Sequence, residues 1–299
     1  MLRSRSAPLS ALVAALALGC SAPPPQQPQQ QPAERLAPRL APGYPESIAR
    51  GERIALPLAE LFVPDGFTVP ASGEVPLCVH FQGGVKAAEE NFARMQRSGV
   101  LIASTLAGRS GAFAEPYRDP AAFRALLAAG EAELLRRCGR DVHFGPLLIT
   151  FWSAGYGAVR ELLRDPDLFA RIDALVSADS IYATVVADDV RAPRIEDMVD
   201  FVRFAQAAAR GEKTFVLAHG RYPTDYASTA ETAQLLRSAV AAVHVPVTAV
   251  TERGVPIACE SHQRGFHCYE FAEATAGIHV DCLYFVPELV RRHVQAPAQ

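Results

Sequence analysis

Lysine is almost absent from this chain. Only Lys86 and Lys213 occur among its 299 residues, and the remaining strongly basic side chains are arginines. Acidic residues outnumber basic ones by 32 to 29, so the formal charge is −3, and the basic residues form no stripe. Because nucleic-acid binding needs a concentrated positive face that neutralises phosphates, the sequence predicts no nucleic-acid partner.

The N-terminal apolar stretch is too short to be a membrane anchor. It runs from Ala7 to Leu18 and follows Arg3 and Arg5, whereas a membrane-spanning helix takes about 20 apolar residues. A charged start followed by a short apolar run is typical of a secretory signal. We therefore expect residues 1–19 to be an export signal rather than part of the fold.

The end of this stretch resembles a bacterial lipobox. In Ala17-Leu18-Gly19-Cys20 the cysteine would become the lipidated first residue of the mature protein; the alternative is an ordinary signal peptide that happens to contain a cysteine. Residues 20–43 are rich in proline and glutamine and hold little to bury, as expected of a tether. The sequence thus predicts a lipid-anchored protein of the bacterial cell envelope, at the periplasmic face or the outer membrane, with residues 44–299 as a single domain.

Cysteine occurs in an odd number beyond Cys20. The five positions are Cys78, Cys138, Cys259, Cys268 and Cys282, so at least one thiol has no partner within the chain. Cys259 and Cys268 flank a polar, turn-like segment and form the favoured disulfide, with unpaired thiols as the alternative. A zinc site from Cys259, His262, His267 and Cys268 is a further alternative, but neighbouring strand residues point to opposite faces and the spacing matches no common zinc pattern. We therefore expect no metal.

The body of the chain alternates short apolar runs with helical patterns. Strands are predicted at 76–81, 100–105, 146–152, 172–178, 214–218, 245–250 and 265–271, and helices at 87–98, 121–138, 154–163, 195–209, 228–242 and 284–294. Continuous apolar strands separated by helices predict an α/β fold with a mostly parallel sheet covered on both faces. Residues 44–74 could add antiparallel strands at its start. Ligands of such sheets bind beyond the carboxyl ends of the strands, so the residues that follow each strand carry the information.

Ser153 follows one of these strands directly. A serine on a strand-to-helix turn is the geometry of a nucleophile elbow, in which the helix N-terminus favours a developing oxyanion. The segment Phe151-Trp152-Ser153-Ala154-Gly155 matches G-x-S-x-G except at its first position, where phenylalanine stands for glycine. The alternative is a serine that only caps the helix.

An acid and a base follow later strands. Asp179 comes directly after the 172–178 strand, and His279 lies in a predicted loop before the last helix. The order serine, aspartate, histidine is that of a hydrolase triad, where histidine is the general base and aspartate fixes its tautomer. His219 is a rival base and Asp225 a rival acid, because both follow the 214–218 strand.

An oxyanion hole is predicted at the turn after the 76–81 strand. Gln82 and Gly83 could present backbone N–H groups there, since glycine allows close approach to a reacting carbonyl. The partner donor would be the N–H of Ala154, the residue after the nucleophile. A plain Gly-Gly turn is the alternative.

Residues 75–294 resemble the α/β-hydrolase superfamily. The resemblance rests on HFQGG, SAGYG, Asp179 and His279. The strings SAGYGAVREL, ASTAETA and GIHVDCLYFVPEL are similar to secreted bacterial esterase- or lipase-like members without an assigned substrate. The resemblance implies a mostly parallel sheet of about eight strands with helices on both faces. It also implies a serine hydrolase that acts on carboxylic esters or amides of small molecules without a cofactor.

Two other function classes compete with this reading. A non-catalytic envelope lipoprotein could retain the hydrolase scaffold as a binding module, because fold does not determine function. A nucleotide-binding domain would need G-x-G-x-x-G after an early strand, but Gly155-Tyr156-Gly157 comes late and lacks the third glycine. Residues 183–195 could form part of a cap over the site, and the Asp188-Asp189 pair within them is expected to be a solvated turn.

Overall fold

The computed structural model describes residues 43–186 and 191–295, which belong to one compact unit, Ala37–Gln299. The predicted export signal, the lipidated Cys20, nearly all of the tether and the Asp188-Asp189 turn lie outside the described residues. Within the two described ranges, no helix is both long and apolar enough to cross a membrane.

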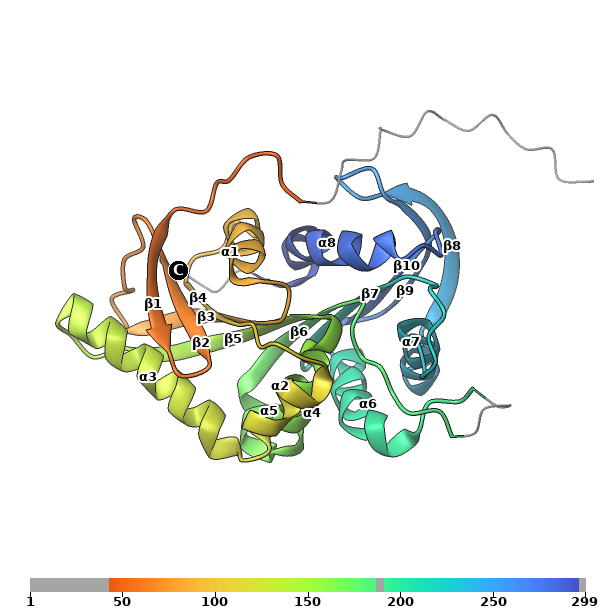
Figure 1. The fold of residues 1–299 in the computed structure, drawn as a ribbon, viewed down its shortest axis with the longest axis horizontal. Coiled ribbons are helices and arrows are strands. Elements are labelled where there is room, and N and C mark those ends of the chain that lie inside the picture. The colour runs from red at the N-terminus through yellow and green to blue at the C-terminus, as the bar shows by residue number, and fades with distance from the viewer. Residues whose placement is uncertain (1–42, 187–190, 296–299) are drawn as a thin grey trace, which may run out of the picture. The chain divides into compact units, whose positions relative to one another are not determined.

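A single twisted sheet forms the centre of this unit (Figure 1). Its strand order is β1-β2-β4-β3-β5-β6-β7-β10-β9-β8; the strands from β4 to β10 in that order run parallel, and antiparallel strands flank them at both edges. The bounds are β1 Gly51–Leu56, β2 Ala59–Pro64, β3 Glu74–Phe81, β4 Val100–Ser104, β5 His143–Trp152, β6 Ile172–Ala178, β7 Thr214–His219, β8 Val243–Val250, β9 Pro256–Gln263 and β10 Phe266–Phe271.

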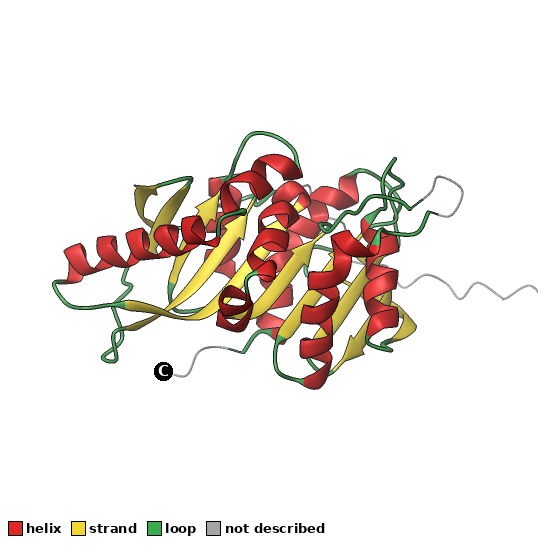
Figure 2. Cartoon of the chain, turned by 90° about the horizontal axis from the view of Figure 1, so that it is seen from below, coloured by secondary structure: helices red, strands yellow, loops and turns green. Residues whose placement is uncertain are grey.

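Helices cover both faces of the sheet. In Figure 1, α1 and α8 lie above it and α3, α4, α5, α6 and α7 below it, and Figure 2 shows the lower layer in front of the strands. The helices are α1 Val85–Arg94, α2 Ser110–Ala114, α3 Pro120–Cys138, α4 Tyr156–Arg164, α5 Pro166–Arg171, α6 Ile195–Arg210, α7 Thr229–Ala239 and α8 Gly277–His293, with 3-10 turns η1 Glu115–Tyr117 and η2 Ser153–Gly155. This arrangement confirms the predicted α/β-hydrolase fold class, a mostly parallel sheet between two helical layers.

The two-sided cover explains why the strands are apolar throughout. Leu77 and Val79 of β3 belong to the core shared with α3, α4 and α6, whereas the intervening Cys78 belongs to the core shared with α1 and α8. Successive strand residues point to opposite faces, so a strand covered on both sides needs apolar residues at every position.

The ends of α3 follow from its flanking residues. Its N-cap, Asp119, accepts a hydrogen bond from the Ala121 N–H at 2.9 Å, and Pro120 occupies the first turn, where its missing N–H is not needed. Gly139 ends the helix in the left-handed conformation (φ 67°). These signals explain why the predicted bounds of this helix are nearly correct.

The sheet has ten strands rather than the expected eight. The strand that was not predicted from the sequence is β9; half-buried and buried residues alternate along most of it because one face of the sheet is only partly covered there. Part of β9 lies in the polar segment between Cys259 and Cys268 that was expected to be turn-like. That segment is instead a tight hairpin, in which β9 and β10 pair from Gln263 and Phe266 onward.

The hairpin register contradicts the favoured disulfide. Cys259 lies opposite Glu270 and Cys268 lies opposite Ser261, and both cysteines carry free thiols. A diagonal offset of two residues separates Cα atoms by about 7–8 Å, which exceeds the usual disulfide span of about 4.4–6.8 Å. The zinc set fails for a related reason: His267 stacks on His293 of α8, while Cys268 faces the opposite core.

Candidate active site

Ser153 occupies a sharp turn between β5 and α4. Its φ angle is 51°, in the left-handed region, and its side chain is half-buried. A non-glycine residue with positive φ is uncommon and marks a position where backbone strain is held in place by the surrounding structure. Such a turn lifts the hydroxyl beyond the carboxyl edge of the sheet, as a nucleophile elbow does.

The small residues after Ser153 are required by backbone packing. A Cβ atom on Gly155 would lie 2.4 Å from the Phe81 carbonyl oxygen, and one on Gly157 would lie 2.1 Å from that of Ser110. The first glycine of G-x-S-x-G normally allows neighbouring backbone to approach closely. In this chain Gly155 and Gly157, which follow the serine, allow such an approach. Phe151 itself is fully buried and stacks on Phe201 of α6, with ring centroids 6.4 Å apart, so the sequence departure fits this core.

The structure brings Asp179 and His279 together, although they are a hundred residues apart in sequence. The His279 Nδ1 atom lies 2.7 Å from Asp179 Oδ2. The other carboxylate oxygen, Oδ1, accepts hydrogen bonds from the Thr229 hydroxyl and, at 3.2 Å, from the Gly220 N–H. Thr229 begins α7 and was not identified from the sequence.

This environment keeps Asp179 ionised. Burial alone raises the pKa of its carboxyl, but hydrogen bonds from His279 and Thr229 outweigh burial and hold the pKa below its ordinary value. An ionised carboxylate only accepts hydrogen bonds, so Nδ1 of His279 carries the proton. The Nε2 atom is then the nitrogen that can accept a proton from a nucleophile.

His279 lies in the first turn of α8, not in the loop expected from the sequence, because α8 begins at Gly277. Trp152 holds this turn: its indole N–H donates to the His279 carbonyl oxygen at 2.6 Å, and its ring lies 4.5 Å from the imidazole at an interplanar angle of 32°. The role of Trp152 was not predicted from the sequence; the one signal for it is its position directly before Ser153. In the described residues, the Ser153 hydroxyl makes no hydrogen bond to His279, and such bonds often tighten only when substrate binds.

The oxyanion turn lies beside the elbow, because β3 and β5 are neighbours and Phe81 is in register with Phe151. Gln82 has a φ of 70°, but its N–H donates to the Ser104 carbonyl oxygen at 2.9 Å. The Gln82 N–H is therefore not available to an oxyanion, which corrects its predicted role. The Gly83 N–H and the Ala154 N–H, near the start of η2, are the remaining predicted donors.

The rival acid and base are placed differently. Asp225 is exposed in the loop between β7 and α7, and within the described part of the chain it makes no ion pair or hydrogen bond with a histidine. His219 is buried; its Nδ1 lies 3.0 Å from the Gly220 carbonyl oxygen, and burial lowers its pKa. It is in register with Glu270 of β10.

Three tyrosines gather next to the elbow. The Tyr182 ring makes edge contacts with Tyr156 at 5.7 Å and with Tyr226 at 5.1 Å, and the Tyr182 hydroxyl donates to the Asp179 carbonyl oxygen at 3.1 Å. The predicted cap begins here, since Ala183 forms a bridge with Ala227. Residues 187–190 of that cap lie outside the described residues.

No protein-family model matches the sequence, and no curated protein matches it. Several solved structures are similar in fold. A ferric enterobactin esterase from Salmonella typhimurium is 11% identical over 78% of this chain and 54% of its own (TM-score 0.44). A siderophore hydrolase from Aspergillus nidulans is 13% identical over 83% and 96% (TM-score 0.44), and a monoglyceride lipase from Saccharomyces cerevisiae is 8% identical over 86% and 100% (TM-score 0.37). This chain spans about half the length of the enterobactin esterase chain.

Proposed function

We propose that the protein is a serine hydrolase that cleaves small carboxylic esters or amides through an acyl-enzyme on Ser153. The observation that carries the proposal is the hydrogen bond between Asp179 and His279, formed at the same sheet edge as the strained turn of Ser153. A buried carboxylate that orients an imidazole beside a strand-to-helix serine is the arrangement that activates a hydroxyl at neutral pH.

Each residue has a defined step in this reaction. His279 Nε2 takes the hydroxyl proton while Ser153 Oγ attacks the substrate carbonyl carbon, and the N–H groups of Gly83 and Ala154 hold the resulting oxyanion. The imidazolium then protonates the leaving alcohol or amine as its bond to the carbonyl carbon breaks. Water, deprotonated by His279, attacks the acyl-enzyme, releases the acid and restores the Ser153 hydroxyl. Asp179 stabilises the imidazolium in both half-reactions.

A fluorophosphonate probe tests the proposal, because it labels an activated serine and not a scaffold serine. We expect label on Ser153 and none in Ser153→Ala, with hydrolysis of p-nitrophenyl esters lost in the same variant. Ser110→Ala is the matched control: its hydroxyl lies 3.1 Å from that of Tyr156 near the elbow, but it has no catalytic role in this scheme. Wild-type protein that is neither labelled nor active on esters of graded chain length would support the binding-module alternative instead.

We also propose that the hydrolase acts at the cell envelope through lipidated Cys20. Stable anchoring requires more than one acyl chain, which a lipoprotein cysteine provides. Cys20→Ser should move the protein from the membrane fraction to the soluble fraction without changing its activity. Unchanged membrane fractionation of this variant would contradict the proposal.

A further inference from the structure

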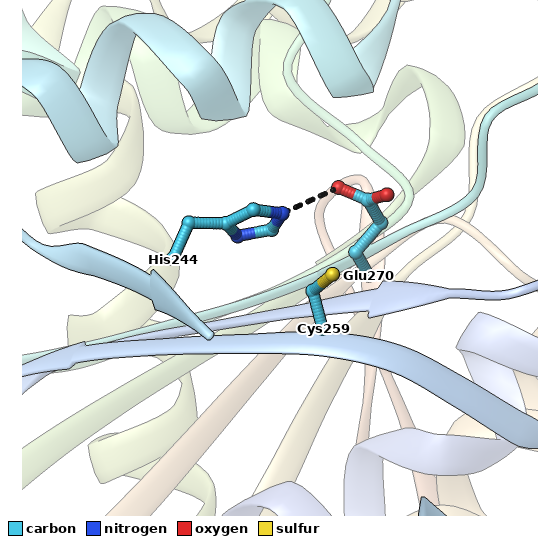
Figure 3. Close-up of side chains that lie close together, drawn as sticks. All are labelled: His244, Cys259 and Glu270. Carbon is cyan, nitrogen blue, oxygen red and sulfur yellow. Dashed lines mark ion pairs between the residues drawn. The ribbon is translucent and has the colours of Figure 1, made fainter. Parts of the chain in front are cut away.

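A second group of polar side chains lies across the antiparallel edge of the sheet, on strands β8, β9 and β10. It consists of His244, Cys259 and Glu270, whose candidate ligand atoms all lie within 4.8 Å of one another (Figure 3). The register explains this, because Cys259 is directly opposite Glu270 and His244 is opposite Ser261, two residues along the same face of β9. Cys259 and Glu270 are buried, and His244 is partly open to solvent.

The ring of His244 lies between the Ser261 hydroxyl and the Glu270 carboxylate. Its Nδ1 lies 3.1 Å from the Ser261 hydroxyl, and its Nε2 lies 3.5 Å from Glu270 Oε2. In the tautomer that carries its proton on Nδ1 and donates it to Ser261, the Nε2 lone pair faces Glu270 Oε2 and can bind a cation shared with that carboxylate.

The nearby charges define which cation fits. Arg221 pairs with Glu270 Oε1, while the guanidinium of Arg237 lies 3.7 Å from Oε2. Hard cations such as calcium need six or more oxygen ligands, which this site lacks. One imidazole, one thiol and one carboxylate are the donors that zinc accepts, with a fourth position left for water. The thiolate and carboxylate together match the charge of a divalent ion, while the positive charges of Arg221 and Arg237 beside Glu270 oppose its binding.

We propose that His244, Cys259 and Glu270 form a zinc-binding site that ties the edge strand β8 to β10. Such a tie would hold a weakly packed strand, because Val243 and Val245 on β8 are exposed and none of its residues is buried. The site is independent of the proposed hydrolase chemistry. It also differs from the set considered from sequence, which shared only Cys259 and contained residues that face opposite sides of the sheet.

Cobalt titration under reducing conditions tests this directly, because tetrahedral cobalt reports its ligands by absorption. We expect the wild-type protein to bind one equivalent, with d–d bands of a four-coordinate site and a thiolate-to-cobalt charge-transfer band, both abolished by excess zinc. Cys259→Ser should lose the charge-transfer band, and Glu270→Gln should weaken binding by about tenfold or more. Cys268→Ser is the matched control, since this buried thiol lies on the same face outside the cluster and its loss should leave both bands unchanged.

Two further measurements separate this site from weak surface binding. Zinc should raise the Tm of the wild-type protein and not that of His244→Ala. Arg237→Met should tighten zinc binding, because a positive charge beside the Glu270 carboxylate is removed. Absence of stoichiometric cobalt binding by the wild-type protein, or a charge-transfer band that survives Cys259→Ser and disappears in Cys268→Ser, would overturn the proposal.

Discussion

Two aspartates were candidates for the triad acid, and their surroundings differ sharply. Asp179 is buried and bonded to His279 Nδ1, whereas Asp225 is exposed. We expect Asp179→Asn to lower kcat by roughly 10⁴, the usual cost of losing the tautomer-fixing acid. Asp225→Asn should change kcat by less than about tenfold, or about 1.4 kcal/mol. Steady-state kinetics on correctly folded variants would measure both, and the reverse ranking would move the acid to Asp225.

Trp152 is a positioning residue that connects the end of β5 to the turn carrying His279. Trp152→Phe keeps an aromatic ring beside the imidazole but removes the N–H bond to the His279 carbonyl, a contribution of about 0.5–1.5 kcal/mol. We expect kcat to fall by about two- to tenfold with KM nearly unchanged. Trp152→Leu, which also removes the ring, should lower kcat further.

A purely structural role for Trp152 would give a different pattern. Both variants would then lose thermal stability while kcat per folded molecule stayed at the wild-type value.

At the scale of elements, the elbow depends on how closely α4 approaches β3. In Gly155→Ala the new Cβ would meet the Phe81 carbonyl oxygen at 2.4 Å, and backbone cannot move aside as a flexible side chain can. We expect the free energy of unfolding to fall by about 1–3 kcal/mol, together with activity. Denaturant titration measures the first effect and ester hydrolysis the second.

Gly111 of α2 is the control for this substitution. It has open space where its Cβ would be and no positive φ, so Gly111→Ala should stabilise the protein by about 0.4–1 kcal/mol through a less flexible unfolded chain. If Gly155→Ala changed the free energy of unfolding no more unfavourably than Gly111→Ala, α4 could shift away from β3 without cost and the prediction would be wrong.

At the scale of the whole molecule, acid stability depends on buried histidine. Burial lowers the pKa of His80 from 6.5 to about 4, while its Nδ1 forms a hydrogen bond with the Thr150 hydroxyl at 2.7 Å. Between these two pH values the unfolded chain binds a proton that the folded chain does not. Stability therefore falls as pH decreases from about 6.5 to about 4, by about 3 kcal/mol from this residue.

His80→Gln should remove that part of the pH dependence. The variant will be less stable than the wild-type protein at pH 7, because a well-packed buried ring is lost, but its free energy of unfolding should fall less steeply towards pH 4. Chemical denaturation at several pH values would show the difference, and parallel curves for the two proteins would rule out His80 as the source.

Local patterns in the sequence predicted most strands, the longer helices and the sheet edge at which chemistry can occur, but not β9, α2 or α5. Apolar runs without alternation predicted a sheet covered on both faces, because each residue of a two-sided strand must be buried. Ser153, Asp179 and the Gln82-Gly83 turn were placed at strand ends by local pattern alone. Local signals also predicted α3, whose capping residues are its immediate neighbours in sequence.

Which of these residues contact one another depends on the tertiary structure. Asp179 rather than Asp225 contacts His279 because β6 lies between β5 and β7 and α8 crosses above them, a relation between segments a hundred residues apart. Strand register explains three further findings. It pairs the Gln82 N–H with the Ser104 carbonyl oxygen, places Cys259 and Cys268 on a diagonal, and brings His244 close to Glu270. Register is a property of paired strands, so no pattern within one segment specifies it.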